Sequence, residues 1–215
     1  MLVHPWDAAQ DADEARAFLV AQGFGQLVAG GRDRAVPVVV PTQYTVDGDD
    51  VALHLARPNP VWAAIDENPL VLLAVAGDWA FVPSAWKAID GEDPALGIPT
   101  TYYAAVQLTA RAEIVDDPEG KAAILRLQQV SLDPEGGWVD PAVHGRTLAG
   151  IRGIRLRVTD VKAKFKYGGN VDAEHREAVA RHLAERAGPG DRAARDRLLH
   201  RLGGSGTLDL AGSDS

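Results

Sequence analysis

The chain has 215 residues, a formal net charge of −8 and a sequence pI near 5.2. It therefore lacks the surplus of lysine and arginine with which proteins bind phosphate backbones, which argues against nucleic acid as a partner. Hydrophobic residues make up 46 % and charged residues 24 %, as is typical of a soluble globular protein. No apolar run reaches the ~18 residues of a membrane helix, and the first residues do not resemble a signal peptide, so we expect no membrane partner and a cytoplasmic location.

The chain contains no cysteine, and its one methionine is Met1. It therefore cannot supply disulfides, thiolate catalysis, cysteine-ligated zinc or iron–sulfur clusters. If the protein holds a haem, the axial ligand must be a histidine, a tyrosine or, more rarely, a lysine.

The first half of the chain predicts one helix followed by short strands. The helix covers 13–22 and ends at Gly23. Strands follow over 25–29 and 35–42, and Pro37 indicates that the second is an edge or bulged strand. A hairpin pairs 44–46 with 51–55 around the turn Asp47-Gly48-Asp49-Asp50, and 59–68 is a short helix.

The second half predicts longer strands and polar helices. Strands cover 70–75, 79–83, 101–114 and 151–165, and helices cover 121–130, about 172–187 and 191–202. Strands and helices do not alternate regularly, and no glycine-rich nucleotide motif is present, so a barrel is favoured over a parallel nucleotide-binding fold. The last residues are rich in glycine and serine, which predicts a disordered tail.

Four segments stand out: His54–Trp62 (HLARPNPVW), Phe81–Trp86 (FVPSAW), Ile98–Val106 (IPTTYYAAV), and Gly150–Ile154 (GIRGI) continued by Lys162–Lys166 (KAKFK). Together they resemble PaiB-like proteins, which are described as FMN-binding negative transcriptional regulators, and the resemblance runs from Met1 to about Asn170. It implies a mainly β protein with helices: a six-stranded split β-barrel of the FMN-binding type plus C-terminal helices. It also implies a homodimer with the cofactor pocket at its interface.

The resemblance and the shift in composition at Asp172 divide the chain into three parts. We expect a cofactor-binding split-barrel domain over 1–170, a helical extension over 171–202 and a disordered tail over 203–215.

Some PaiB-like proteins are haem-dependent piperazate synthases, which form an N–N bond by cyclising N5-hydroxy-L-ornithine to L-piperazate. Thr101-Tyr102-Tyr103 stands where the family typically has Trp-Asn-Tyr, and Gln107 stands where a histidine is common. These departures favour a haem b enzyme of this type, with an amino-acid substrate. The alternative is an FMN-binding protein that acts as a negative transcriptional regulator or a flavin-dependent oxidoreductase. A third hypothesis is a dimer without a cofactor that acts through contacts with partners.

Under the haem reading, His54 is the candidate iron ligand, because it ends a predicted strand and begins the strongest motif. The alternative is that its ring is a hydrogen-bonded anchor for the turn before Pro58. The remaining histidines lie outside the motifs, in the leader, a loop and the polar helices: His4, His144, His175, His182 and His200.

Three cations in the motifs, Arg57, Arg152 and Lys164, suit haem propionates or an FMN phosphate. Arg155 and Arg157 alternate with apolar residues on the same strand, so we expect them on the surface.

The aromatic residues of the motifs supply the remaining candidates. Tyr102 or Lys164 would protonate the departing hydroxide. Tyr102 and Tyr103 point to opposite faces of one strand, so at most one of them faces the cofactor. Trp86 would cover the flat ring, whereas Trp62 and Trp79 are expected in the core.

Overall fold

The computed structural model describes residues 1–89 and 92–203. The strands are β1 (Phe24–Ala29), β2 (Val38–Gln43), β3 (Thr45–Asp47), β4 (Asp50–Ala56), β5 (Leu70–Val82), β6 (Thr100–Val115) and β7 (Ile151–Lys166). The α-helices are α1 (Ala12–Gln22), α2 (Val61–Glu67), α3 (Pro118–Leu132), α4 (Ala173–Arg186) and α5 (Asp191–Gly203). The 3₁₀ helices are η1 (Pro5–Asp7), η2 (Ser84–Lys87), η3 (Pro94–Leu96) and η4 (Pro141–Gly150).

The strands form one sheet in the order β2-β1-β5-β6-β7-β4-β3. Neighbours pair antiparallel at β1–β2, β1–β5, β3–β4 and β4–β7. The predicted class, mainly β with C-terminal helices, is confirmed. The sheet has seven strands where the resemblance implies six.

Contacts divide the chain into two compact units, each described by itself. The first unit comprises Met1, Gln10–Ala76 and Val106–Ala163. The second comprises Leu2–Ala9, Gly77–Ala105 and the chain from Lys164. Strands β5, β6 and β7 contribute residues to both. The predicted division at residue 170 follows composition rather than contacts, and it stays a prediction.

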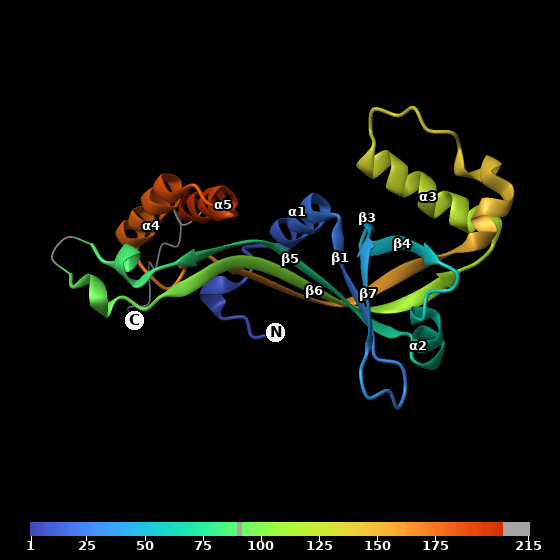
Figure 1. The fold of residues 1–215 in the computed structure, drawn as a ribbon, viewed down its shortest axis with the longest axis horizontal. Helices are drawn as coiled ribbons and strands as arrows, with labels where there is room; N and C mark the ends of the chain where they lie inside the picture. The colour runs from blue at the N-terminus through green and yellow to red at the C-terminus, as the bar shows by residue number, and fades with distance from the viewer. Residues whose placement is uncertain (90–91, 204–215) are drawn as a thin grey trace, which may run out of the picture. The chain divides into compact units, whose positions relative to one another are not determined.

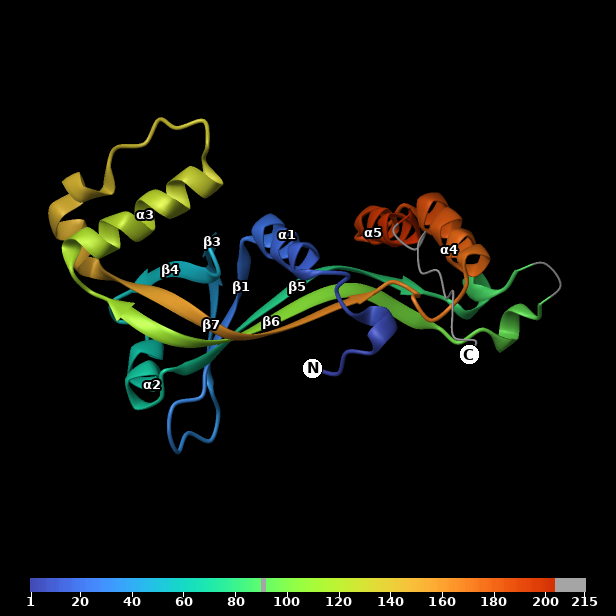
Figure 2. The ribbon, with the colours of Figure 1, turned by 180° about the vertical axis from the view of Figure 1, so that it is seen from behind.

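In the first unit, two helices cover parts of the sheet. Helix α2 buries Val61, Trp62 and Ile65 on one face, as the spacing of its apolar residues predicts. Helix α3 lies alongside β4, which both Figure 1 and Figure 2 show. Gly153 permits this approach, because a Cβ on it would stand 2.5 Å from the Cδ1 atom of Ile124. The largest buried aliphatic side chains of this unit are Leu27, Leu53, Leu73, Leu108, Ile124, Ile154 and Leu156.

In the second unit, α4 and α5 pack against each other (Figure 1). They bury Val179, Leu183 and Leu198, and the strand ends bury Tyr102 and Phe165.

The N-terminal segment of the second unit, which contains His4, packs against β7. It forms η1, Ala8 makes an antiparallel bridge to Lys164, and Asp7 is only 3 % exposed.

Several sequence rules for element ends hold in the structure. The side chain of Asp11 accepts from the Glu14 N–H at the start of α1, and Gly23 ends the helix in the left-handed region at φ 57°. β2 lies at a sheet edge, as Pro37 predicts. The strands predicted separately over 70–75 and 79–83 are one strand, β5.

Two further findings concern helices and the chain end. Within the described ranges, no helix combines the length and apolar character needed to cross a bilayer. The predicted disordered tail lies, beyond Gly203, outside the described residues.

Candidate functional site

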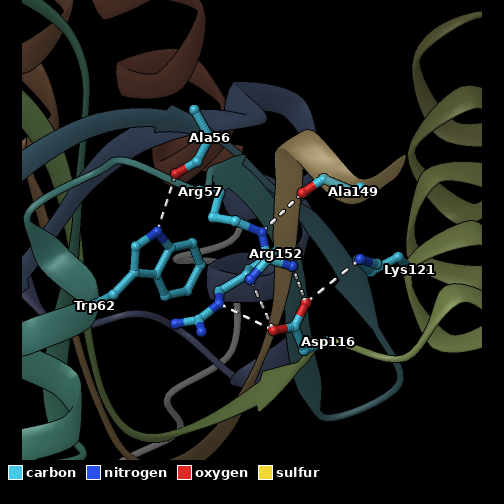
Figure 3. A network of polar contacts seen from close by, with 7 residues as sticks. All are labelled: Ala56, Arg57, Trp62, Asp116, Lys121, Ala149 and Arg152. Carbon is cyan, nitrogen blue, oxygen red and sulfur yellow. Dashed lines mark hydrogen bonds and ion pairs between the residues drawn. The ribbon is translucent and has the colours of Figure 1, made fainter. Parts of the chain in front are cut away.

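A cluster of three cations around one carboxylate lies in the first unit (Figure 3). The guanidinium of Arg57 donates from Nη1 and Nη2 to both oxygens of Asp116. Arg152 donates from Nε to Asp116 at 3.1 Å, and Lys121 donates from Nζ at 3.3 Å. We call Arg57, Asp116, Lys121 and Arg152 the Asp116 cluster. It unites two predicted cofactor-binding residues, Arg57 and Arg152.

The Asp116 cluster has a net formal charge of +2, since three cations share one carboxylate. The hydrogen bonds from Arg57, with that from Lys121, lower the pKa of Asp116 to about 2, against the opposing effect of desolvation. Lys121 is 4 % exposed, so Asp116 neutralises a cation that has little access to water.

Local chain geometry places these groups. Asp117 is the N-cap of α3 and accepts from the Gly120 N–H at 2.7 Å, so the neighbouring Asp116 is left to pair with the cations. Arg57 follows β4, and its Nε donates to the Ala149 carbonyl at 2.7 Å. The register of β4 and β7 pairs Leu55 with Arg152, which brings Arg152 close to the end of β4.

Arg152 uses only part of its guanidinium in the cluster. Its Nε bonds Asp116, and its terminal nitrogens point away from that carboxylate in Figure 3. Its Cζ atom lies 5.6 Å from the centre of the Trp62 ring, and Trp62 is held in turn by its Nε1 donating to the Ala56 carbonyl. In the described residues, neither terminal nitrogen of Arg152 has a hydrogen-bond acceptor.

His54 lies on the β4 face covered by α3, whereas Arg152 lies on the other face of the sheet. Its Nδ1 is 2.6 Å from Oε1 of Gln128. An amide oxygen only accepts, so Nδ1–H is the donor of this hydrogen bond. The half-buried ring is thus anchored to α3, and the described chain places no protein partner on Nε2. No group of three or more potential metal-binding side chains occurs among the described residues.

The second unit places two predicted residues together, Tyr103 and Lys164. Nζ of Lys164 lies 5.8 Å from the centre of the Tyr103 ring and donates to the Leu2 carbonyl at 3.1 Å. The same ammonium is 3.9 Å from Asp7. Burial raises the pKa of Asp7, and Lys164 opposes that rise.

Tyr102 faces the opposite side of β6 from Tyr103 and is 1 % exposed. Burial raises its pKa to about 12, so the phenol stays protonated at neutral pH. Its hydroxyl has no hydrogen-bond partner in the described structure and lies under Gly168, where a Cβ would be 2.4 Å from it.

Trp86 lies in η2 and already has two neighbours from α4. The ring of His182 stacks on it at 5.2 Å between centroids, and the Arg186 guanidinium lies 4.4 Å from its centre. Trp62 is buried as expected, but Trp79 is 63 % exposed, which corrects its assignment to the core.

Sequence reasoning missed Asp116, Lys121 and Gln128. A usable signal was present for Lys121, since a lysine in the first turn of a helix opposes the helix dipole unless an acidic group pairs with it. The adjacent acidic pair Asp116-Asp117 before α3 was a second signal, because only one of them can be the N-cap.

Comparisons with known proteins agree on the family. The family model described as "Putative FMN-binding domain" matches residues 1–160. The chain is 23 % identical over 177 residues to the "Protease synthase and sporulation protein PAI 2" of Bacillus subtilis (strain 168), covering 79 % of this chain and 83 % of that protein.

Solved structures share the fold. The FAD and haem binding protein from Mycobacterium smegmatis matches with a TM-score of 0.60 and 15 % identity, over 80 % of this chain and 79 % of that one. The flavocytochrome Anf3 from Azotobacter vinelandii matches with a TM-score of 0.57 and 22 % identity, over 80 % and 75 % of the chains. The predicted split barrel is thereby confirmed. Because the family model spans most of the sequence, this chain belongs to the PaiB-like family of FMN-binding split-barrel proteins.

Proposed function

We propose that this protein binds FMN and that the Asp116 cluster holds the phosphate of that cofactor. The observation that carries this proposal is the net charge of +2 on the cluster, together with the terminal N–H groups of Arg152 that have no acceptor. A phosphate monoester carries a charge of about −1.5 to −2 at neutral pH, so it would balance the cluster. Bound FMN would supply hydride or single-electron transfer.

The chain's own residues would divide the work of binding. Arg152 would donate to phosphate oxygens through its planar fork. Arg57 would raise the local positive potential while its contacts to Asp116 and the Ala149 carbonyl keep it in place. Asp116 would stop three cations from repelling one another before the cofactor arrives.

The homodimer predicted from the resemblance has support in the first unit. The outer face of β2, β1 and β5 presents apolar side chains at paired positions, with Val28 opposite both Val39 and Leu72. Val39 is 47 % exposed, and Val28 and Leu72 are half-buried. A cluster of accessible apolar side chains on a sheet face favours association, and a second copy of the chain is the proposed occupant. Leu72→Lys should then lower the mass seen in sedimentation equilibrium.

A second candidate, haem b, is favoured by the arrangement of His54. An imidazole whose Nδ1–H is held by Gln128 presents Nε2 to a metal, as metal-binding histidines commonly do. The two solved structures above, a flavocytochrome and a FAD and haem binding protein, place haem among the groups bound by proteins of this fold. The reaction proposed for this second candidate is the cyclisation of N5-hydroxy-L-ornithine to L-piperazate, with Tyr102 and Lys164 as proton donors. This reaction rests on the resemblance alone.

The absorption spectrum of the protein, purified and then saturated with FMN or haemin, separates the two candidates. Retained flavin bands after dialysis support the main proposal. A retained Soret band that His54→Ala removes supports the second and calls for an assay with N5-hydroxy-L-ornithine. If the protein gains neither a flavin spectrum nor a Soret band when it is titrated with FMN and with haemin, both cofactor proposals are overturned. The remaining hypothesis is then a dimer without a cofactor.

The role of the Asp116 cluster has its own test. Wild type should bind FMN at least tenfold more tightly than riboflavin, which lacks the phosphate, if the charge-assisted bonds contribute as such bonds usually do. Arg152→Ala should reduce FMN affinity to that of riboflavin. The matched control is Arg157→Ala, since Arg157 lies on the same strand and pairs with Asp50 and Glu113. Equal loss in both variants would contradict the assignment.

A further inference from the structure

A pocket of about 540 Å³ lies within the second unit, apart from any residue of the Asp116 cluster. One wall is the outer face of β5 with Trp79 and Phe81, and the other is the connection from α4 to α5 with Arg186, Gly188 and Gly190. Its volume falls in the range of about 300–1,000 Å³ that is usual for small-molecule sites.

The connection between α4 and α5 is built against the strand. Gly190 has φ +80° and approaches so closely that a Cβ would lie 2.2 Å from the Trp79 carbonyl oxygen. Asp191 is 1 % exposed and accepts from the Gly188 N–H at 2.8 Å and from Nε of Arg186 at 2.7 Å. The pocket wall is therefore fixed by buried polar contacts before any ligand binds.

The floor of the pocket is aromatic and accessible. Trp79 and Phe81 are two residues apart on β5, so their rings share one face of the strand. They are 63 % and 47 % exposed. Two large aromatic side chains left open within a pocket match a planar ring that can stack on them.

The polar end of the pocket is the Arg186–Asp191 ion pair, in which the guanidinium is the more exposed partner. Arg186 bonds the buried Asp191 through Nε and Nη2 and lies over the Trp86 ring. Its Nη1 has no acceptor among the described residues, and its side chain is 34 % exposed. A guanidinium held on two sides in this way offers its remaining N–H groups to an acceptor that enters the pocket, and a carboxylate is the strongest such acceptor.

We propose that this pocket binds a small planar aromatic carboxylate, with the ring on Trp79 and Phe81 and the carboxylate at Nη1 of Arg186. Such a ligand has a flat apolar ring that can stack on the aromatic side chains of β5. It also has one anionic group that can accept from the Arg186 guanidinium. The inference does not rest on the FMN proposal, because every residue in it belongs to the second unit and none contributes to the Asp116 cluster.

The test uses anthranilate as the probe and the full-length protein without added cofactor. Binding should quench tryptophan fluorescence, because Trp79 is exposed in the pocket. Aniline, which has the ring without the carboxylate, should bind at least tenfold more weakly if Arg186 receives the carboxylate. Trp79→Ala should weaken anthranilate binding by about tenfold or more, which is the usual effect of losing one stacking partner.

A control variant outside the pocket and a second variant within it complete the test. Trp138→Phe changes a half-buried tryptophan located in the first unit and should leave affinity unchanged. Phe81→Ala should weaken binding and leaves the Arg186–Asp191 pair intact, so the test does not depend on a substitution of Arg186 that could prevent folding. Equal affinity for anthranilate and aniline, or unchanged binding in both Trp79→Ala and Phe81→Ala, would overturn the proposal. FMN affinity measured on the same variants should stay at the wild-type value, so failure of this site is distinguishable from failure of the FMN site.

Discussion

Replacing Asp116 by asparagine removes the one anion of the Asp116 cluster while preserving the size of the side chain. The lowered pKa of Asp116, about 2, would correspond to about 2 kcal/mol if no water screened the pairs. Its side chain is 38 % exposed, so screening reduces this contribution to about 1 kcal/mol. Lys121 is 4 % exposed and would lose its partner, which adds about 1–3 kcal/mol. We therefore expect Asp116→Asn to lower the free energy of unfolding by about 2–4 kcal/mol.

A double-mutant cycle with Lys121→Met isolates the buried lysine. Lys121→Met removes the buried charge and keeps an apolar chain of similar length, so on its own it should cost less than about 1 kcal/mol. In the double variant, the loss should shrink to about 1 kcal/mol, because no unpaired buried cation remains. Urea unfolding followed by far-UV circular dichroism measures all four proteins at constant m value. If the double variant is as unstable as Asp116→Asn alone, the reasoning about Lys121 is wrong.

Three further predictions follow from single contacts. The pKa of Asp116 is lowered in the folded protein, so the contribution of the Asp116 carboxylate to stability should be complete above about pH 4 and disappear as the pH falls toward about 2. In acid titrations, the wild-type protein should therefore lose stability over that window more steeply than Asp116→Asn. Tyr102→Phe should leave thermal stability unchanged or raise it, because the buried hydroxyl has no partner, whereas Tyr44→Phe should cost about 1 kcal/mol because its hydroxyl donates to the Leu19 carbonyl at 2.8 Å. Gly153→Ala should destabilise the first unit by about 1–3 kcal/mol, since its Cβ would meet Ile124, and Ile124→Val should restore part of that loss in calorimetry.

Local rules predicted much of the secondary structure. A glycine at position 23 ends α1, and Pro37 precedes an edge strand, because capping and proline effects act within one helical turn or one hydrogen bond. The four motifs were also sufficient to predict the family. Local rules were less reliable where two strands merge, since β5 runs through Gly77 without a break.

The composition and local patterns of the sequence determined the acidic, cysteine-free character of the chain, its helix ends and its mainly β class. Only the tertiary structure decided which charges meet. Arg57 and Asp116 are 59 positions apart, and Arg152 joins them through the pairing of β4 with β7. The tertiary structure likewise placed His54 under α3 and left Trp79 exposed. Side-chain exposure and ion pairing depend on strand register and helix docking, which sum many weak contacts between distant segments, and no short stretch of sequence encodes that sum.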